Sequence, residues 1–205
     1  MLKKDSYFAY FLLFISYAIF GIYHPVQKQG LDSGYAPIEF AAASMFFASI
    51  FLVPFAFREY KKHKLKINKK VIYEFLLLGF LATVLAPLLK LYGLFLTSAN
   101  NVALITATSG VFITLIAYLL FKEKMPNYFF PVILFMSLGL FLFKTPSGFN
   151  FSSFGIGDLC VFSFVILVSL STNLAKKYML NFPSILISSA RLLFGLPLLF
   201  LLYFR

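Results

Sequence analysis

The sequence predicts an all-α integral membrane protein with about seven transmembrane helices. Hydrophobic residues make up 61% of the 205 residues, charged residues only 12%, and mean hydropathy is +0.90. Soluble domains carry about 25% charged residues, so lipid must be the solvent for much of this chain. Apolar runs recur along nearly the whole sequence and are long enough to cross about 30 Å of hydrocarbon. They are continuous rather than alternating, which disfavours a β-barrel.

Turn-forming and basic residues separate the apolar segments. The expected spans cover 7–24, 38–57, 72–96, 99–121, 128–144, 156–174 and 184–204. Breaks between the first two spans are expected at Pro25, Gly30, Gly34 and Pro37. The fifth span is expected to end at Pro146 and Gly148.

The distribution of lysine and arginine predicts the orientation of the spans. Segment 58–70 is strongly basic, with Arg58, Lys61, Lys62, Lys64, Lys66, Lys69 and Lys70. Placing it in the cytoplasm puts most other basic residues on the same side, namely Lys3, Lys4, Lys122, Lys124, Lys176 and Lys177. We therefore expect a multi-pass protein of the plasma or inner membrane with a cytoplasmic N-terminus. The net charge of +11 is then a topology signal that contacts anionic lipid, and no nucleic-acid partner is expected.

Two stretches of the chain resemble each other in the order of their features. Both contain a basic residue, a short loop, a proline, a span and an aromatic-arginine end, from Lys28 to Arg58 and from Lys177 to Arg205. The repeating unit then has five spans. Because five is an odd number, the second copy has the opposite orientation in the membrane. On this count the second copy is partial and the chain looks truncated, so we expect the 205 residues alone not to transport. If the natural chain does end at Arg205, we expect a homodimer or a degenerate relative.

Residues 92–105 read Tyr-Gly-Leu-Phe-Leu-Thr-Ser-Ala-Asn-Asn-Val-Ala-Leu-Ile and run on to Glu123. This stretch resembles the third-to-fourth-span signature of the EamA-like drug/metabolite transporter family. Gly157-Asp158-Leu159 resembles the start of that family's second repeat, and Ala190-Arg191-Leu192-Leu193 its arginine-bearing second helix. The resemblance implies ten spans in two inverted repeats, with both termini cytoplasmic, and export or exchange of small metabolites. It places the first five-helix repeat at 1–147 and the first two helices of the second at 148–205.

These features favour a secondary transporter that moves a small organic solute by alternating access, driven by a proton or a counter-solute. An intramembrane enzyme is a second hypothesis, but G-x-S-x-G and H-E-x-x-H motifs are absent and there is no catalytic pair of intramembrane acids, so we expect no enzyme. Only His24, His63 and Cys160 could supply imidazole or thiolate ligands, so a structural zinc site is not expected, and neither metal nor cofactor is expected. A non-transporting polytopic protein, such as a sensor or an assembly partner, is the third hypothesis, and a dry helix interface beside Arg191 would favour it.

Three charged residues are candidates for the substrate path. Lys90 lies inside the third span and either binds an anionic group or extends to the outer interface. Arg191 lies near the middle of the seventh span and either faces a cavity or bonds carbonyls of a neighbouring helix. Glu39 opens the second span and either pairs with Lys28 or Lys90, exchanges a proton, or is stabilised by the helix dipole alone.

Further candidates are Asn101, Thr106 and Gly110 of the fourth span. The small side chains of this span gather on one helix face, which either lets helix backbones approach closely or lines the path. Asn173, late in the sixth span, either lines the cytoplasmic half of the path or bonds to neighbouring helices.

A structural role is expected for the charged residues at the cytoplasmic end of the fourth span. Glu123 matches the glutamate of the family signature and is flanked by Lys122 and Lys124. We expect these three residues to form an interfacial salt-bridge network.

Overall fold

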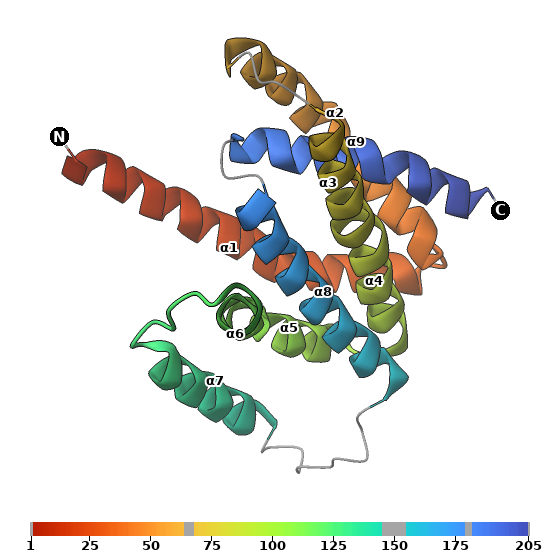
Figure 1. Cartoon of the computed structure of the whole chain (residues 1–205). Coiled ribbons are helices and arrows are strands. Elements are labelled where there is room, and N and C mark those ends of the chain that lie inside the picture. Colours follow the sequence, from red (N-terminus) through yellow and green to blue (C-terminus); the bar gives the residue numbers. More distant parts are fainter. Residues whose placement is uncertain (1, 64–67, 145–154, 179–181, 205) are drawn as a thin grey trace.

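A computed structural model shows the protein as a bundle of helices (Figure 1). It describes residues 2–63, 68–144, 155–178 and 182–204. The elements are α1 (Leu2–Asp32), α2 (Pro37–His63), α3 (Lys69–Gly79), the π-helix η1 (Phe80–Leu85), α4 (Ala86–Leu96), α5 (Ala99–Ala107), α6 (Ser109–Phe121), α7 (Phe129–Lys144), α8 (Ile156–Tyr178) and α9 (Ser184–Tyr203). No strand occurs among these residues, which confirms the predicted all-α class.

Six helical runs of the described chain are long and apolar enough to cross a membrane. They are Tyr10–Asp32, Pro37–Lys62, Lys69–Leu96, Ala99–Phe121, Ile156–Tyr178 and Ser184–Tyr203. The remaining expected span, 128–144, corresponds to α7, whose 16 residues make it shorter than the others. Predictions that fall on Lys64, Lys66, Pro146, Gly148, Arg205 and the boundary at 147/148 lie outside the described residues.

The structure corrects three expected boundaries. Pro25 does not end the first span, because α1 continues through it to Asp32. Membrane helices tolerate an internal proline where neighbouring groups satisfy the freed backbone. α2 extends past the expected end at 57 to His63. The expected helix 99–121 is interrupted at Thr108, whose hydroxyl donates to the Ile105 carbonyl at 2.6 Å and so competes with the helical hydrogen bond.

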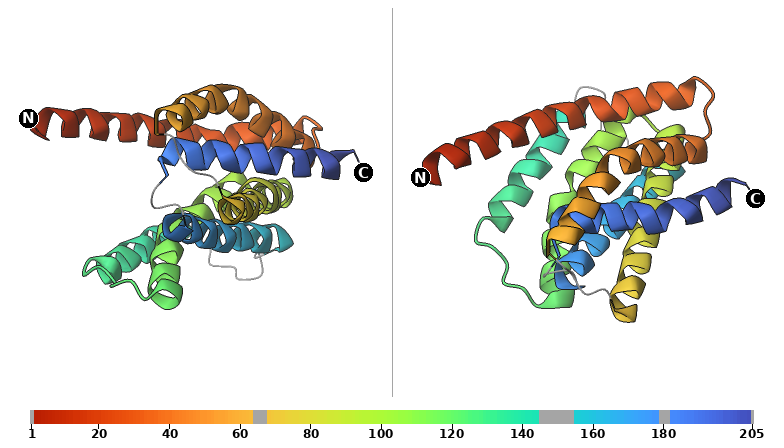
Figure 2. Two further views of the ribbon diagram at one scale, coloured as in Figure 1. Left: turned by 45° about the horizontal axis from the view of Figure 1, so that its top comes forward. Right: turned by 90° about the horizontal axis from the view of Figure 1, so that it is seen from above.

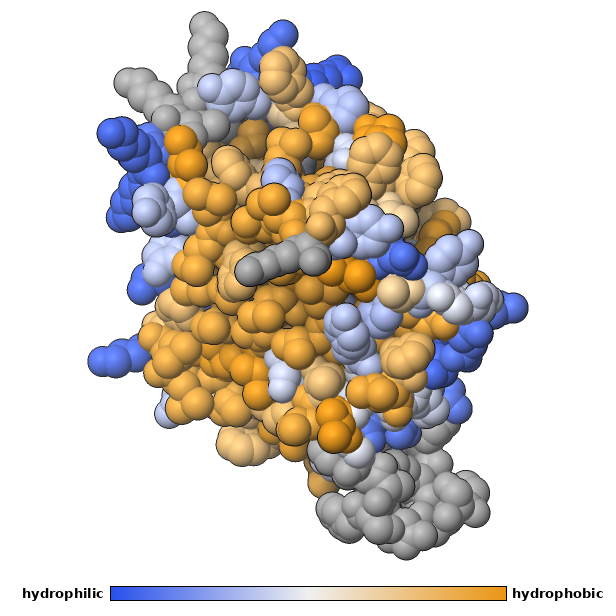
Figure 3. All heavy atoms as spheres, turned by 90° about the vertical axis from the view of Figure 1, so that its right-hand side faces the viewer, coloured by the Kyte–Doolittle hydropathy of each residue, from blue (hydrophilic) through white to orange (hydrophobic). Residues whose placement is uncertain are grey.

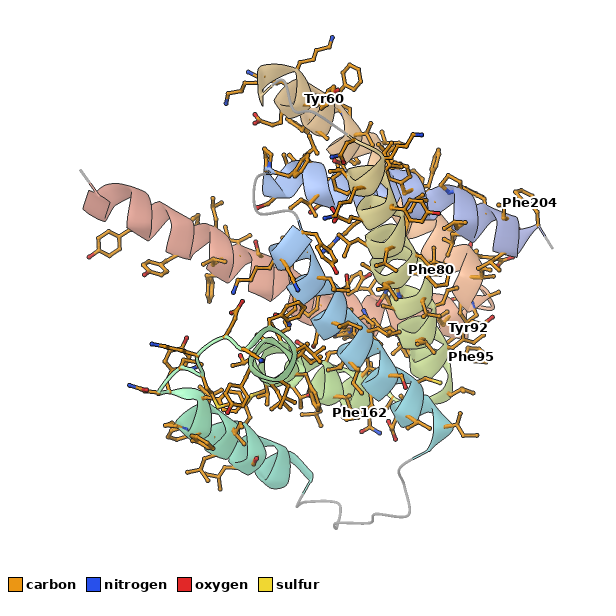
Figure 4. The ribbon with its side chains drawn as sticks, in the orientation of Figure 1. Tyr60, Phe80, Tyr92, Phe95, Phe162 and Phe204 are labelled. Atoms are coloured by element: carbon orange, nitrogen blue, oxygen red, sulfur yellow. The ribbon has the colours of Figure 1, made fainter. Side chains whose placement is uncertain are left out.

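The outer surface of the bundle is largely apolar. In Figure 3 hydrophobic residues cover the middle of the face and hydrophilic residues gather toward its margins. Many exposed side chains are aromatic, and Figure 4 shows Tyr92 and Phe95 on the outer side of α4, 45% and 50% exposed. In the same view Tyr60, near the end of α2, lies toward the top, and Phe204, directly after α9, lies at the right. Such a surface is suited to hydrocarbon contact.

Two pairs of glycines set how the central run Lys69–Leu96 crosses its neighbours. At the α4–α8 crossing, a Cβ on Gly93 would lie 2.8 Å from the Gly157 carbonyl oxygen, and one on Gly157 would lie 3.0 Å from that of Gly93. At the crossing with α9, a Cβ on Gly195 would lie 2.5 Å from Thr83 Cβ and 3.0 Å from the Gly79 carbonyl oxygen. Both crossings therefore bring backbone against backbone, as is common between helices in lipid. The two views of Figure 2 show α9 and α8 packed on this central run.

The buried apolar side chains form two clusters. One contains Leu31, Ala41, Ala42, Val84, Leu91, Leu94, Val102, Val161 and Leu199. The other contains Phe75, Leu78, Ala175, Leu186 and Ala190. On the central run, on α8 and on α9, the two clusters occupy successive stretches of the same helix.

A methyl group at Gly157 tests the α4–α8 crossing. Gly157→Ala should lower the free energy of unfolding by about 1–3 kcal/mol, because the nearest obstacles include backbone that cannot turn aside. Gly139→Ala in α7 is the matched control, since nothing lies within 4 Å of a Cβ placed on Gly139. Because alanine favours helix more than glycine does, this variant should be as stable as the parent protein or slightly more stable. Thermal unfolding of both variants in detergent, followed by circular dichroism, makes the comparison. Equal stability of the two variants would contradict the close crossing.

Candidate functional site

A buried lysine lies where α1, α4 and α8 meet. Lys90 is 6% exposed, and its Nζ donates to Gln27 Oε1 at 2.9 Å. The ammonium lies 4.2 Å from the centre of the Tyr23 ring and 6.0 Å from that of Phe164. It is therefore turned inward and is stabilised by an amide oxygen and aromatic faces.

Polar side chains of α1 and α5 extend this site. His24 and Thr106 are 3% and 8% exposed, with His24 Nε2 and Thr106 Oγ1 3.4 Å apart. His24 Nδ1 is buried and has no hydrogen-bond partner in the part of the chain that the structure describes. We call Tyr23, His24, Gln27, Lys90 and Thr106 the Lys90 cluster.

Lys90 has unused hydrogen-bond donors and lacks an acidic partner among the described residues. An ammonium has three donors, and the described contacts of Lys90 supply one acceptor, Gln27. No carboxylate among the described residues forms an ion pair with it. The cluster is thus chemically suited to bind an anionic or acceptor-rich group of a small molecule.

A second cation lies in α9. Arg191 Nη2 is 3.5 Å from the carbonyl oxygen of Ser171 in α8. The Arg191 carbonyl accepts a hydrogen bond from Thr83 Oγ1 at 3.0 Å. Arg191 Nε and Ser171 Oγ are buried without a partner in the described chain. The carbonyl contact matches the structural alternative for Arg191, but it leaves most of the guanidinium donors unused.

Asn101 does not join the Lys90 cluster. Its Nδ2 donates to Asp158 Oδ1 at 3.3 Å and to Thr97 Oγ1 at 3.2 Å. Asp158, which is 3% exposed, also accepts from Thr97 Oγ1 at 2.8 Å and from the Gly155 amide at 3.2 Å. These bonds join the α4–α5 turn to the first turn of α8. Sequence reasoning gave Asp158 no such role, because its partners are distant in the chain.

Glu39 lies at the start of α2, away from both cations. Its Oε2 accepts from the Ala36 amide at 3.0 Å, which agrees with the helix-terminus alternative. Lys28 instead pairs with Asp32 at 3.3 Å and donates to the Leu94 and Phe95 carbonyls at the end of α4.

The small-residue face of α5 and α6 is exposed only in its middle part. Gly110 is exposed, and a Cβ there would meet nothing within 4 Å. Ala103 and Ala107 are exposed as well, whereas Thr106 belongs to the Lys90 cluster. Asn173 is buried and donates from Nδ2 to the Ile113 and Ser169 carbonyls, both at 2.9 Å, which is the neighbour-bonding alternative.

Glu123 forms its ion pair with Lys176 of α8 and not with the adjacent lysines. Lys176 Nζ lies 2.7 Å from Oε1 and 2.6 Å from Oε2 of Glu123. Lys122 ends α6 in a left-handed conformation, with φ 54°, and Lys124 lines the same groove as Glu123 and Lys176. The expected salt-bridge network therefore includes the acid that the sequence indicated, but its partner comes from a different helix.

Comparison with known proteins agrees with this architecture. Residues 7–145, which include the α1, α4 and α5 parts of the Lys90 cluster, match the EamA-like transporter family. The chain belongs to the EamA-like transporter family. It is 32% identical over 171 residues to a protein of Methanothermobacter thermautotrophicus named "Uncharacterized transporter". That match covers 77% of this chain and 50% of the relative, so the chain spans about half the length of the curated relative it matches. No solved structure matches the chain.

Family membership confirms the resemblance drawn from the 92–105 stretch and from Glu123. The matched residues end before α8 and α9. The helices that carry Asp158 and Arg191 thus lie beyond the family match, although the resemblance in the sequence extended to them.

A charge exchange tests the link between α6 and α8. Both side chains are substantially exposed, so Glu123→Gln should lower the free energy of unfolding by less than about 1 kcal/mol. Glu123→Lys should lower it further through repulsion with Lys176, and the added change Lys176→Glu should restore most of the loss. Thermal unfolding of the single and double variants measures the coupling, and purely additive effects would show that the pair does not interact.

Proposed function

We propose that the protein is a secondary transporter, and not an enzyme, that moves a small organic metabolite across the membrane by alternating access. Its family and the name of its archaeal relative support transport in general. The observation that carries the proposal is the position of Lys90, buried against Gln27 and Tyr23 in the interior of the bundle. Lysine at the centre of a membrane helix costs about 2.5–3.5 kcal/mol and is usually found where it serves a path or a binding site.

The proposed organisation has a first five-helix repeat at 1–147 and the first helices of an inverted second repeat at 148–205. The packing supports this division, because the central run of the first part crosses α8 and α9 of the second at the two glycine pairs. Transporters built from inverted repeats bind their substrate at the interface between the repeats. Lys90 beside Phe164, and Arg191 beside Thr83, lie at that interface.

We also propose that the protein lies in the plasma or inner membrane with its N-terminus in the cytoplasm. The basic residues at the ends of α6 and α8 lie together, with Lys176 paired to Glu123 and Lys177 Nζ 5.0 Å from the Phe121 ring centre. Tyr60 near the end of α2 lines a pocket with Leu186 at the start of α9. These helix ends form one basic side of the bundle, which supports a cytoplasmic location.

Single-cysteine labelling tests the orientation. In a Cys160→Ser background, Asn100→Cys should react with a membrane-impermeant maleimide on intact cells, because it lies at the opposite end from the basic loop. Lys70→Cys should react only after lysis, since it lies next to that loop. Asn100 and Lys70 are both exposed, so a difference in labelling reports the side of the membrane on which each residue lies. The reverse labelling pattern would contradict the orientation.

Counterflow into liposomes tests transport. Proteoliposomes that contain the protein at its full natural length, preloaded with an unlabelled metabolite, should accumulate the labelled form above protein-free liposomes, within a panel of amino acids, carboxylates and nucleosides. Lys90→Gln should reduce the rate about 10- to 100-fold, the effect of losing one hydrogen bond to a charged group. Lys69→Gln, at an exposed position, is the matched control and should transport normally. Normal transport by Lys90→Gln would show that Lys90 is not part of the substrate path.

The same assay tests whether further helices are required. Uptake by liposomes containing only the 205 residues, above protein-free liposomes, would contradict the expectation that this length does not transport alone. The same result would still support the proposal that the protein is a transporter.

A further inference from the structure

The residues around Arg191 form a polar layer between the two apolar clusters. On the central run, Thr83 lies between Leu78 of one cluster and Val84 of the other. On α9, Arg191 follows Ala190 of one cluster and precedes Leu199 of the other. Ser171 likewise lies on α8 between Val161 and Ala175. Three helices thus contribute a polar residue at the same level of the bundle, which we call the Arg191 layer.

The donors of the Arg191 layer exceed its acceptors. A guanidinium has five N–H donors in a planar fork. The described structure gives it one long contact, 3.5 Å to the Ser171 carbonyl, and leaves Arg191 Nε unpartnered. Ser171 is 1% exposed, and its hydroxyl is also unpartnered among the described residues. Buried donors normally have partners, so the layer is suited to receive an acceptor from outside the chain.

The charge of the layer indicates what kind of acceptor this is. No carboxylate of the described residues pairs with Arg191. The buried carboxylate of Asp158 is held by Thr97, Asn101 and the Gly155 amide, and Glu123 is held by Lys176. Water could satisfy the Ser171 hydroxyl but would not compensate the guanidinium. An oxyanion does both, and the fork geometry of arginine fits carboxylate and phosphate.

The Arg191 layer and the Lys90 cluster follow each other along the same two helices. Thr83 and Lys90 are seven residues apart on the central run, and Phe164 and Ser171 are seven residues apart on α8. Seven residues span roughly 10 Å at about 1.5 Å per residue. On both helices, the position at the Arg191 layer and the position at the Lys90 cluster therefore lie about that far apart along the helix axis.

We propose that the Arg191 layer is a second anion-binding position, in series with the Lys90 cluster, and that the transported solute is an organic anion bearing a carboxylate or phosphate group. Arg191 and the Ser171 hydroxyl donate to the oxyanion, while Thr83 holds the Arg191 backbone in place. This inference rests on the proposed function, since it names the class of solute that uses the path.

Anion-dependent stability tests the second position without requiring transport. The purified protein is melted in neutral detergent with sodium succinate or sodium phosphate, against sodium chloride at equal ionic strength, and followed by circular dichroism. A bound anion should raise Tm by about 2–5 °C near saturation. Arg191→Gln and Ser171→Ala should each lose at least half of the shift. Lys69→Gln should keep the full shift, which excludes a general surface-charge effect.

The arginine variants separate binding from folding. Arg191→Lys keeps the charge but loses the fork, and we expect it to retain a smaller shift than the parent protein. Ser171→Ala removes one hydroxyl and keeps the charge, so it still tests the layer if Arg191→Gln fails to fold. Lys90→Gln should retain part of the shift, because the Arg191 layer is intact. A shift lost in Lys90→Gln and unchanged in Arg191→Gln and Ser171→Ala would overturn the second position.

Two further results would overturn the inference. The first is the absence of any shift with succinate or phosphate in the parent protein. The second is stabilisation by added phosphatidylglycerol, lost in Arg191→Gln, without an effect of the soluble anions, because the oxyanion would then belong to a lipid headgroup. Counterflow distinguishes these failures from failure of the proposed function. With the protein at its full natural length, transport of a neutral solute without an anion shift removes the inference alone, whereas an anion shift without transport of any solute removes the function.

Discussion

Close backbone contact between paired glycines is the constraint on which the arrangement of this bundle depends. Apolar side chains gain little by leaving lipid for one another, so helices in membranes associate through packing and polar contacts. Gly93 with Gly157, and Gly79 with Gly195, allow the central run to approach α8 and α9 at backbone distance. The Arg191 carbonyl reaches Thr83 because of one crossing, and Phe164 approaches Lys90 on the helix that the other crossing holds. The close crossings that the glycines permit thus position Lys90 and Arg191.

The buried Lys90 and the half-buried Arg191 are both costly in such a bundle, and the two sites reduce the cost differently. Lys90 has an amide oxygen at 2.9 Å and an aromatic face at 4.2 Å, so its charge is partly solvated by the protein. Arg191 has one carbonyl at 3.5 Å, and an unpartnered hydroxyl belongs to the same serine. The less satisfied of the two sites therefore has more to gain from a ligand. This difference is the physical basis for placing an anion beside Arg191 as well as beside Lys90.

The sequence identified features that depend on local composition and missed those that depend on contacts between distant segments. Lys90 and Arg191 stand out because a charge within an apolar run is rare, and the helices follow from the runs themselves. The sequence does not reveal the site roles of His24 and Gln27, because Pro25 predicts a break that α1 does not have. The helical spacing from Tyr23 to Gln27 and Leu31 was the available signal. The Glu123 pair with Lys176 joins residues 53 positions apart, which no single-sequence pattern reveals.

The π-helix η1 explains how one helical run can serve two sites on different sides. In a continuous α-helix, residues seven positions apart return to nearly the same face, because two turns contain about 7.2 residues. Thr83 nevertheless contacts α9, whereas Lys90 contacts α1 through Gln27 and Tyr23. The wider turns of η1, which include Thr83, change the rotation between these positions. The change of rotation at η1 therefore lets a single helical run contact α9 at Thr83 and α1 at Lys90.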